Sequence, residues 1–167
     1  IVKVMYVTPG LGGGGGAERS LASLVSHWRG RIDLEVVTFS DRAELACDII
    51  DGGARVTNLD GHSMHAVIGQ LRRLIKERRP DLVHSVLFDA DVATRLATPA
   101  GIPVSCSLVN VNYGPQQWEA PGRSRWKVTA VQAIDAISAQ RVARFHALSS
   151  EVASVMKERL RISRDRI

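Results

Sequence analysis

The chain has 167 residues, of which 45% are hydrophobic, 23% are charged and 5% are aromatic. This length fits about one globular domain, and no apolar run approaches the roughly 20 residues that a membrane-spanning helix needs. The formal net charge of +5 favours anionic partners such as phosphates or a membrane surface. Nucleic acid is not expected, because no nucleic-acid-binding module is recognisable.

The two cysteines, Cys47 and Cys106, lie far apart in the sequence and fit no metal-ligand spacing. Lone thiols are typical of proteins kept in a reducing cytoplasm. We therefore expect no metal, no cofactor and a cytoplasmic protein.

Strand-like and helix-like segments alternate along the chain. In chain order we predict a strand at Ile1–Val7, a helix at Ala17–His27, a strand at Asp33–Phe39, a helix at Ala43–Ile50, a strand at Arg55–Leu59, a helix at Val67–Arg79, a strand at Asp81–Ser85, a helix at Ala90–Thr98, a strand at Pro103–Leu108, a loop at Asn110–Gly122, a helix at Arg123–Arg144, a strand at Phe145–Leu148 and a helix at Glu151–Leu160. This alternation predicts an α/β fold with a doubly wound, mostly parallel sheet. Ligands of such sheets bind at the carboxyl ends of the strands.

A glycine-rich loop follows the first predicted strand and precedes the first helix. Its core is Gly12, Gly13, Gly14, Gly15 and Gly16. Glycine lets the backbone approach a ligand closely, and the start of a helix carries free N–H groups and a positive dipole end. The loop is therefore a candidate cradle for a diphosphate.

Four segments of the chain, Gly15–Leu21, Arg79–Ser85, Ala100–Val104 and Ala147–Val152, together resemble the N-terminal half of the family-4 retaining glycosyltransferases. The segment Gly15–Leu21 (Gly-Gly-Ala-Glu-Arg-Ser-Leu) is similar to the glycine-rich signature of that family. Arg79–Ser85, Ala100–Val104 and Ala147–Val152 are similar to three further family motifs, in the right order.

The resemblance implies a Rossmann-like N-terminal domain of a GT-B glycosyltransferase, in which two such domains face each other across a cleft. Residues 1–167 would form the acceptor-side domain, with the donor-binding domain absent from this chain. The full protein would move a sugar from a nucleotide-sugar donor to a hydroxyl acceptor, and lipid-linked acceptors are among those that the resemblance implies. This fragment alone would be inactive.

Polar residues at the ends of the later strands are candidates for the acceptor cleft. They are Glu18, His84, Ser85, Asp89, Asn110, Asn112, Tyr113, Ser149 and Glu151. All but Ser85 also have a structural alternative. It is a buried, hydrogen-bonded histidine for His84, helix stabilisation for Glu18, helix capping for Asp89, Ser149 and Glu151, and turn formation for Asn110, Asn112 and Tyr113. Family members often carry a histidine at the position of Val86, and some carry one near Val109, but this sequence has neither. The catalytic groups therefore stay unassigned.

Two further hypotheses remain open from the sequence. Gly10–Gly15 formally satisfies the G-x-G-x-x-G pattern of NAD(P)-dependent oxidoreductases, with Asp41 near the end of the second strand. The basic residues of the helix at Val67–Arg79, which are Arg72, Arg73, Lys76, Arg78 and Arg79, are a candidate patch for an anionic membrane surface. That patch would place the protein peripherally on the inner face of the membrane.

Overall fold

The computed structural model describes residues 1–61, 63–112 and 125–167. Its strands are β1 (Val2–Val7), β2 (Ile32–Thr38), β3 (Arg55–Asn58), β4 (Leu82–Val86), β5 (Val104–Leu108) and β6 (Arg144–Ala147). Its helices are α1 (Gly16–Trp28), α2 (Ala46–Asp51), α3 (Met64–Arg78), α4 (Phe88–Ala97), α6 (Arg125–Ala139) and α7 (Ser150–Leu160), followed by a 3₁₀ turn, η1 (Arg164–Arg166).

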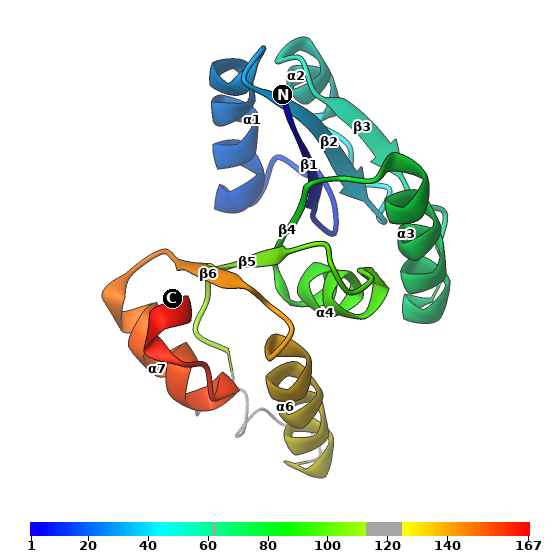
Figure 1. The fold of residues 1–167 in the computed structure, drawn as a ribbon. Coiled ribbons are helices and arrows are strands. Elements are labelled where there is room, and N and C mark those ends of the chain that lie inside the picture. The colour runs from blue at the N-terminus through cyan, green and yellow to red at the C-terminus, as the bar shows by residue number, and fades with distance from the viewer. Residues whose placement is uncertain (62, 113–124) are drawn as a thin grey trace.

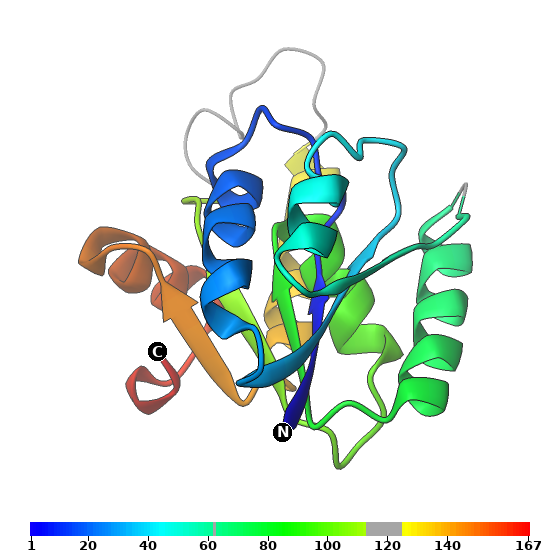
Figure 2. The same ribbon diagram turned by 90° about the horizontal axis from the view of Figure 1, so that it is seen from above.

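The strands form one sheet in the order β3-β2-β1-β4-β5-β6, and every neighbouring pair is parallel. Strand order reverses between β1 and β4, so the predicted doubly wound α/β fold is confirmed. The loops that follow the strands share one edge of the sheet, at the top of Figure 2, where the chain bends into α1. Such a reversal point is where ligands of open α/β sheets bind.

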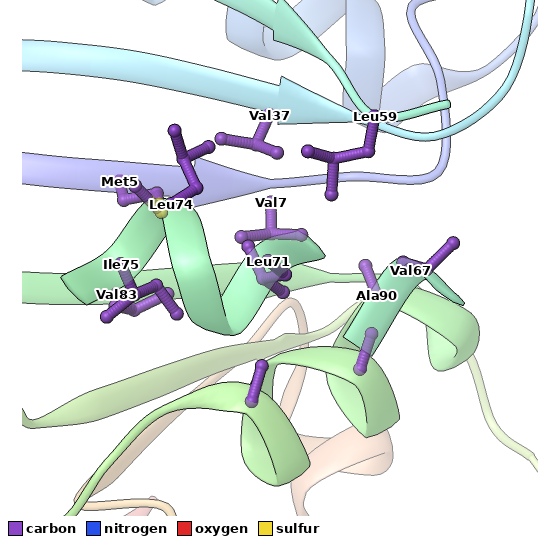
Figure 3. Close-up of a cluster of buried hydrophobic side chains, with 12 residues drawn as sticks. Met5, Val7, Val37, Leu59, Val67, Leu71, Leu74, Ile75, Val83 and Ala90 are labelled. Carbon is purple, nitrogen blue, oxygen red and sulfur yellow. The ribbon is translucent and has the colours of Figure 1, made fainter. Parts of the chain in front are cut away.

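The helices cover the two faces of the sheet unequally. Residues of α1 and α2 pack on β1 and β2 in one apolar cluster, which includes Leu21, Val25, Leu34, Val36 and Ile49. The opposite face carries α3 and α4 over β1, β2 and β4, and α6 and α7 over β5 and β6 (Figures 1 and 3). Among the described residues, no helix lies on the α1 face of β5 and β6, which leaves a hollow beside α1.

The predicted helix at Arg123–Arg144 extends too far at its C-terminal end. The described part of α6 stops at Ala139, and the next residues form a tight turn with i→i−3 bonds, such as Val142 N–H to the Ala139 carbonyl. Ala143 then donates to the Val104 carbonyl beside β5, and β6 begins at Arg144. Val142 lies three residues after Ala139 and belongs to the same core cluster, so the buried face of the helix continues into this turn.

The segment Ala100–Val104, which resembles a family motif, contains a glycine that the turn requires. Gly101 has a φ of 97°, a left-handed conformation that side-chain-bearing residues rarely adopt. This glycine turns the chain from the end of α4 into β5. No helix among the described residues is long and apolar enough to cross a membrane.

Candidate functional site

A groove of about 850 Å³ lies between α1 and the uncovered face of the sheet. Its upper end, at the carboxyl edge, is lined by Gly15, Gly16, Glu18, Leu87 and Asn110. Below them, the side chains of β1, β4, β5 and β6 that point to the α1 face form the floor. The groove therefore begins at the edge where ligands of this fold bind and continues along α1.

The glycine loop is held in place by contacts with its own helix and with the next loop. The Arg19 Nε donates to the Gly13 carbonyl at 2.6 Å. The Leu11 N–H donates to the Arg42 carbonyl, and the Leu45 N–H donates to the Leu11 carbonyl. Gly15 is the N-cap of α1, and no side chain caps the helix there. The start of α1 therefore has no side-chain cap, and the diphosphate loop stays a prediction from the sequence.

Glu18 lies in the first turn of α1 and folds back over the loop. A Cβ added at Gly15 would lie 1.9 Å from the Glu18 Oε2, so the carboxylate covers the Gly15 backbone. A carboxylate at this position stabilises the positive end of the helix dipole. It also faces the groove, where it can accept a hydrogen bond from a ligand hydroxyl.

His84 occupies the floor of the groove and uses both ring nitrogens. Its Nδ1 lies 2.6 Å from the Ser105 Oγ and its Nε2 3.1 Å from the Ser107 Oγ. Its ring packs beside the Tyr6 ring, with the centroids 5.1 Å apart. Because both nitrogens have partners, the structure favours the buried, hydrogen-bonded histidine over a catalytic base.

Burial sets the protonation states in this floor. It lowers the pKa of His84 to about 4, with the nearby His146 adding to the effect, and it raises the pKa of Tyr6 to about 12. His84 is therefore a neutral imidazole and Tyr6 an intact phenol at physiological pH. The floor offers neutral donors and acceptors, which suit sugar hydroxyls.

We expect the neutrality of His84 to be measurable by NMR. Its imidazole should titrate near pH 4, and not near the ordinary 6.5, because the buried ring resists protonation. Because the folded-state pKa of His84 lies below its unfolded value, the neutral ring contributes stability that is fully present above pH 6.5. This contribution, on the order of 3 kcal/mol, is lost as the pH falls towards 4.

Asp91 has the opposite effect on the pH dependence of stability. Burial raises its pKa to about 6, so its contribution to the free energy of unfolding declines as the pH rises through that value. The comparison must therefore be made between the wild type and His84→Gln. The difference in unfolding free energy between them should shrink between pH 6.5 and pH 4. A His84 signal that titrates at 6.5 would contradict the described environment.

The remaining predicted residues divide between the groove and other places. Asn110 lines the groove, and Asp89 lies exposed in the first turn of α4, where Leu87 and not Asp89 is the N-cap. Ser149 accepts a bond from the Val152 N–H and so caps α7. Tyr113 lies outside the described residues.

Three further predicted cleft residues do not line the groove either. The Asn112 carbonyl accepts from Arg159 of α7, and Glu151 is exposed in the first turn of α7. Ser85 is fully buried on the opposite face of the sheet, where its hydroxyl donates to the Asp91 Oδ1 at 2.6 Å. His84 and Ser85 were both expected in the cleft, but neighbouring strand residues point to opposite faces, so only one could be there.

Sequence reasoning missed several residues of the site. Ser105 and Ser107 alternate with buried residues along β5, and this period of two was a usable signal. Tyr6 and His146 reach the groove from β1 and β6 through strand register, which no local pattern reveals. Leu87 has a φ of 75°, a conformation that costs roughly 1–3 kcal/mol and is concentrated at functional sites.

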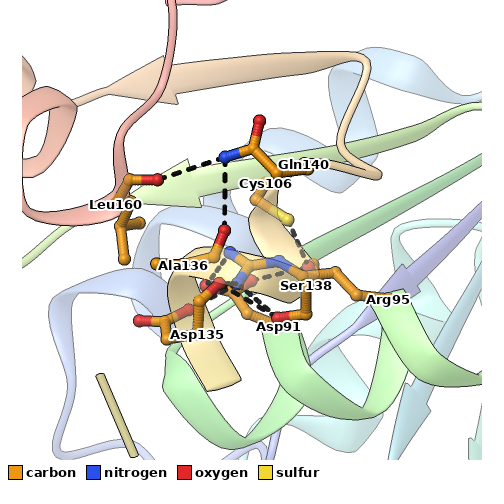
Figure 4. Close-up of polar contacts among 9 residues, drawn as sticks. Asp91, Arg95, Cys106, Asp135, Ala136, Ser138, Gln140 and Leu160 are labelled. Carbon is orange, nitrogen blue, oxygen red and sulfur yellow. Dashed lines mark hydrogen bonds and ion pairs between the residues drawn. The ribbon is translucent and has the colours of Figure 1, made fainter. Parts of the chain in front are cut away.

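A buried charge network lies beneath this edge of the sheet, on the face of α4 and α6 (Figure 4). The Arg95 Nη1 contacts the Asp135 Oδ1 at 2.5 Å, and the Arg95 Nη2 lies 3.7 Å from the Asp91 Oδ2. Arg95 is 1% exposed. Burial opposes its charge, but the nearby Cys106, Asp91 and Asp135 outweigh burial and raise the pKa of Arg95. These contacts link α4 to α6 on the face of the sheet opposite the groove.

Comparisons with known proteins bear on the family and the fold of the chain. The family described as the glycosyl transferase 4-like domain matches residues 15–167. The fold is similar to that of a glycosyltransferase from Rickettsia africae (TM-score 0.72, 16% identity, covering 99% of this chain and 41% of that one). It is also similar to Anabaena HepE solved with UDP-glucose (TM-score 0.70, 17% identity, 95% and 41%) and to a UDP-GlcNAc 2-epimerase from Neisseria meningitidis (TM-score 0.59, 12% identity, 99% and 45%). No curated protein matches the sequence.

Proposed function

Because the chain belongs to the glycosyl transferase 4-like domain family, we propose that it is the acceptor-side half of an enzyme that transfers a sugar from a nucleotide-sugar to a hydroxyl group. The chain spans about two-fifths of the solved structures it resembles (41% of the Rickettsia africae enzyme), which supports a donor-binding domain elsewhere in the full protein. The observation that carries the proposal is the convergence of the glycine loop, Glu18 and Asn110 at one end of a groove.

The parts of the groove have distinct roles in this proposal. Backbone N–H groups between Gly13 and Gly16 hold the donor diphosphate at the start of α1, once the Glu18 carboxylate has moved away from the Gly15 backbone, and stabilise the charge that grows on the leaving group. The Glu18 carboxylate and the Asn110 amide bind acceptor hydroxyls. The His84–Ser105–Ser107 cluster shapes the floor and does not move protons.

The stereochemistry and cellular location follow from the resemblance and not from a visible catalytic group. We propose retention at the anomeric carbon, supported by the similarity of Gly15–Leu21 to the family signature. We also propose an acceptor that is lipid-linked or otherwise available at the cytoplasmic face of a membrane. NMR of the product anomer and fractionation of cell extracts test these two points.

The competing functions share the fold but not the family match. The 2-epimerase resembles this chain in fold at 12% identity, so fold alone does not choose between epimerisation and transfer. For the oxidoreductase alternative, the glycine loop satisfies the G-x-G-x-x-G pattern only because it is a run of glycines. The match over residues 15–167 favours glycosyl transfer over both.

We expect residues 1–167 alone to fold and to release no nucleoside diphosphate from UDP-sugars or GDP-sugars, because the groove supplies only one side of the reaction. The longer protein should release it under the same conditions. Release by the chain alone would contradict the two-domain arrangement.

NAD or NADP should not bind to the chain more tightly than about 10 μM by calorimetry, and tighter binding would favour the oxidoreductase.

A further inference from the structure

Leu87 has a backbone conformation that leucine rarely adopts. It follows β4 directly, with a φ of 75° and a ψ of 148°, and it is the N-cap of α4. This combination lies close to a region of backbone space that is essentially confined to glycine. The leucine side chain belongs to none of the apolar core clusters that the described residues form, so core packing does not explain it. Glycine would make the same turn without strain.

The segment that carries Leu87 is fixed from the opposite face of the sheet. Ser85, two residues earlier, is fully buried and donates to the Asp91 Oδ1 at 2.6 Å. The Asp91 N–H donates to the Leu87 carbonyl at 2.9 Å, and the Asp91 carboxylate lies 3.7 Å from the Arg95 Nη2 in the buried charge network (Figure 4). Buried contacts therefore hold the chain on both sides of Leu87, which is the kind of surrounding structure that keeps a strained residue in place.

The strained residue lies between the two loops to which the proposed function assigns its ligands. In the sheet, β4 stands between β1 and β5, so the turn after β4 lies between the glycine loop and the loop of Asn110. Leu87 is partly exposed and lines the groove together with Gly16, Glu18 and Asn110. With the diphosphate on one side of Leu87 and the acceptor hydroxyl on the other, the sugar is exchanged next to this side chain.

We propose that Leu87 is a specificity-determining residue that favours transfer of the sugar to the acceptor over its loss to water. The inference rests on the proposed function. The apolar side chain occupies space that a water molecule would otherwise fill beside the anomeric carbon, and it offers that water no hydrogen bond. The neighbouring Glu18 and Asn110 are polar and can hold water as readily as an acceptor hydroxyl, so only an apolar group can exclude it.

The reaction that Leu87 suppresses is hydrolysis of the donor. In hydrolysis, the water oxygen bonds to the anomeric carbon, and the bond between that carbon and the diphosphate oxygen breaks. The nucleoside diphosphate leaves and the attacking water loses a proton. Transfer differs only in that an acceptor hydroxyl takes the place of water. The ratio of free sugar to glycosylated acceptor therefore measures the discrimination, and a purely structural role for Leu87 would not change it.

A melting experiment on the 167-residue chain tests the strain without any sugar. Leu87→Gly should melt at least about 2 °C above Leu87→Ala, because glycine accepts a positive φ and alanine does not. Leu96 is the matched control, since it is the same residue type inside α4, is 39% exposed and does not line the groove. There the glycine variant should melt below the alanine variant, because glycine weakens a helix. The same order at Leu87 as at Leu96 would overturn the proposal.

Product analysis in the full-length protein tests the discrimination itself. With a UDP-sugar or GDP-sugar and an acceptor that the wild type glycosylates, Leu87→Ala should raise the ratio of free sugar to glycosylated acceptor at least about fivefold. Leu96→Ala should keep the wild-type ratio. A wild-type ratio in Leu87→Ala, with transfer still present, would overturn this inference alone. A wild type that glycosylates no acceptor would overturn the proposed function and this inference with it.

Discussion

Replacing Gly16 with valine is expected to reduce sugar transfer by the full-length enzyme by at least about tenfold while leaving the thermal midpoint nearly unchanged. A Cβ at Gly16 meets no atom within 4 Å, and Gly16 is not among the glycines with positive φ. The folded chain can therefore accept a side chain there. A loss of turnover would have to come from blocking the close approach of the diphosphate to the start of α1.

Gly69→Val is the control for this test. Gly69 is also an exposed helical glycine with open space around its Cβ position, but it lies on α3, far from the groove. Both substitutions should change stability by no more than roughly 0.5 kcal/mol. Unchanged turnover in the Gly16 variant would mean that the loop is only a connector between β1 and α1.

The largest stability effect is expected from Arg95→Met. Removing the guanidinium takes the Arg95 counter-charge away from the buried carboxylates of Asp91 and Asp135, and breaking a buried ion pair in this way typically costs about 3–5 kcal/mol. For a domain of this size, the midpoint of thermal unfolding should fall by roughly 10 °C. Urea unfolding followed by circular dichroism measures the effect directly.

A matched variant separates charge from packing in this network. Adding Asp91→Asn and Asp135→Asn to Arg95→Met removes the two buried carboxylate charges and should recover a large part of the lost stability. A loss below about 1 kcal/mol for Arg95→Met alone would mean that the network is hydrated and not buried as described.

The order of strands and helices could be predicted because each element has its own periodicity and its own start or stop signal. The Ser149 cap of α7 and the Gly101 turn are local, and local chemistry determines both. The end of α6 was misplaced because Val142 lies at helical spacing from the buried Ala139, yet it reaches the core from a turn.

The site itself was only partly predictable, because its side chains meet through strand register. His84, Ser105 and Ser107 come together only once β4 pairs with β5, with His84 opposite Ser105. Asp91 and Arg95 form an i,i+4 pair that is typical of an exposed helix surface, yet both are buried, because Asp135 approaches from a helix 40 residues further along the chain.

The products that the full-length protein forms from a nucleotide-sugar test the central claim most directly. With UDP-glucose and other UDP-sugars and GDP-sugars, each offered with a set of hydroxyl acceptors, mass spectrometry should detect a nucleoside diphosphate and an acceptor that has gained one sugar. Formation of both should depend on the acceptor and should decline in the Gly16→Val variant. Recovery of the sugar-nucleotide as its epimer, with no sugar on any acceptor, would contradict the account and assign this fold to epimerisation.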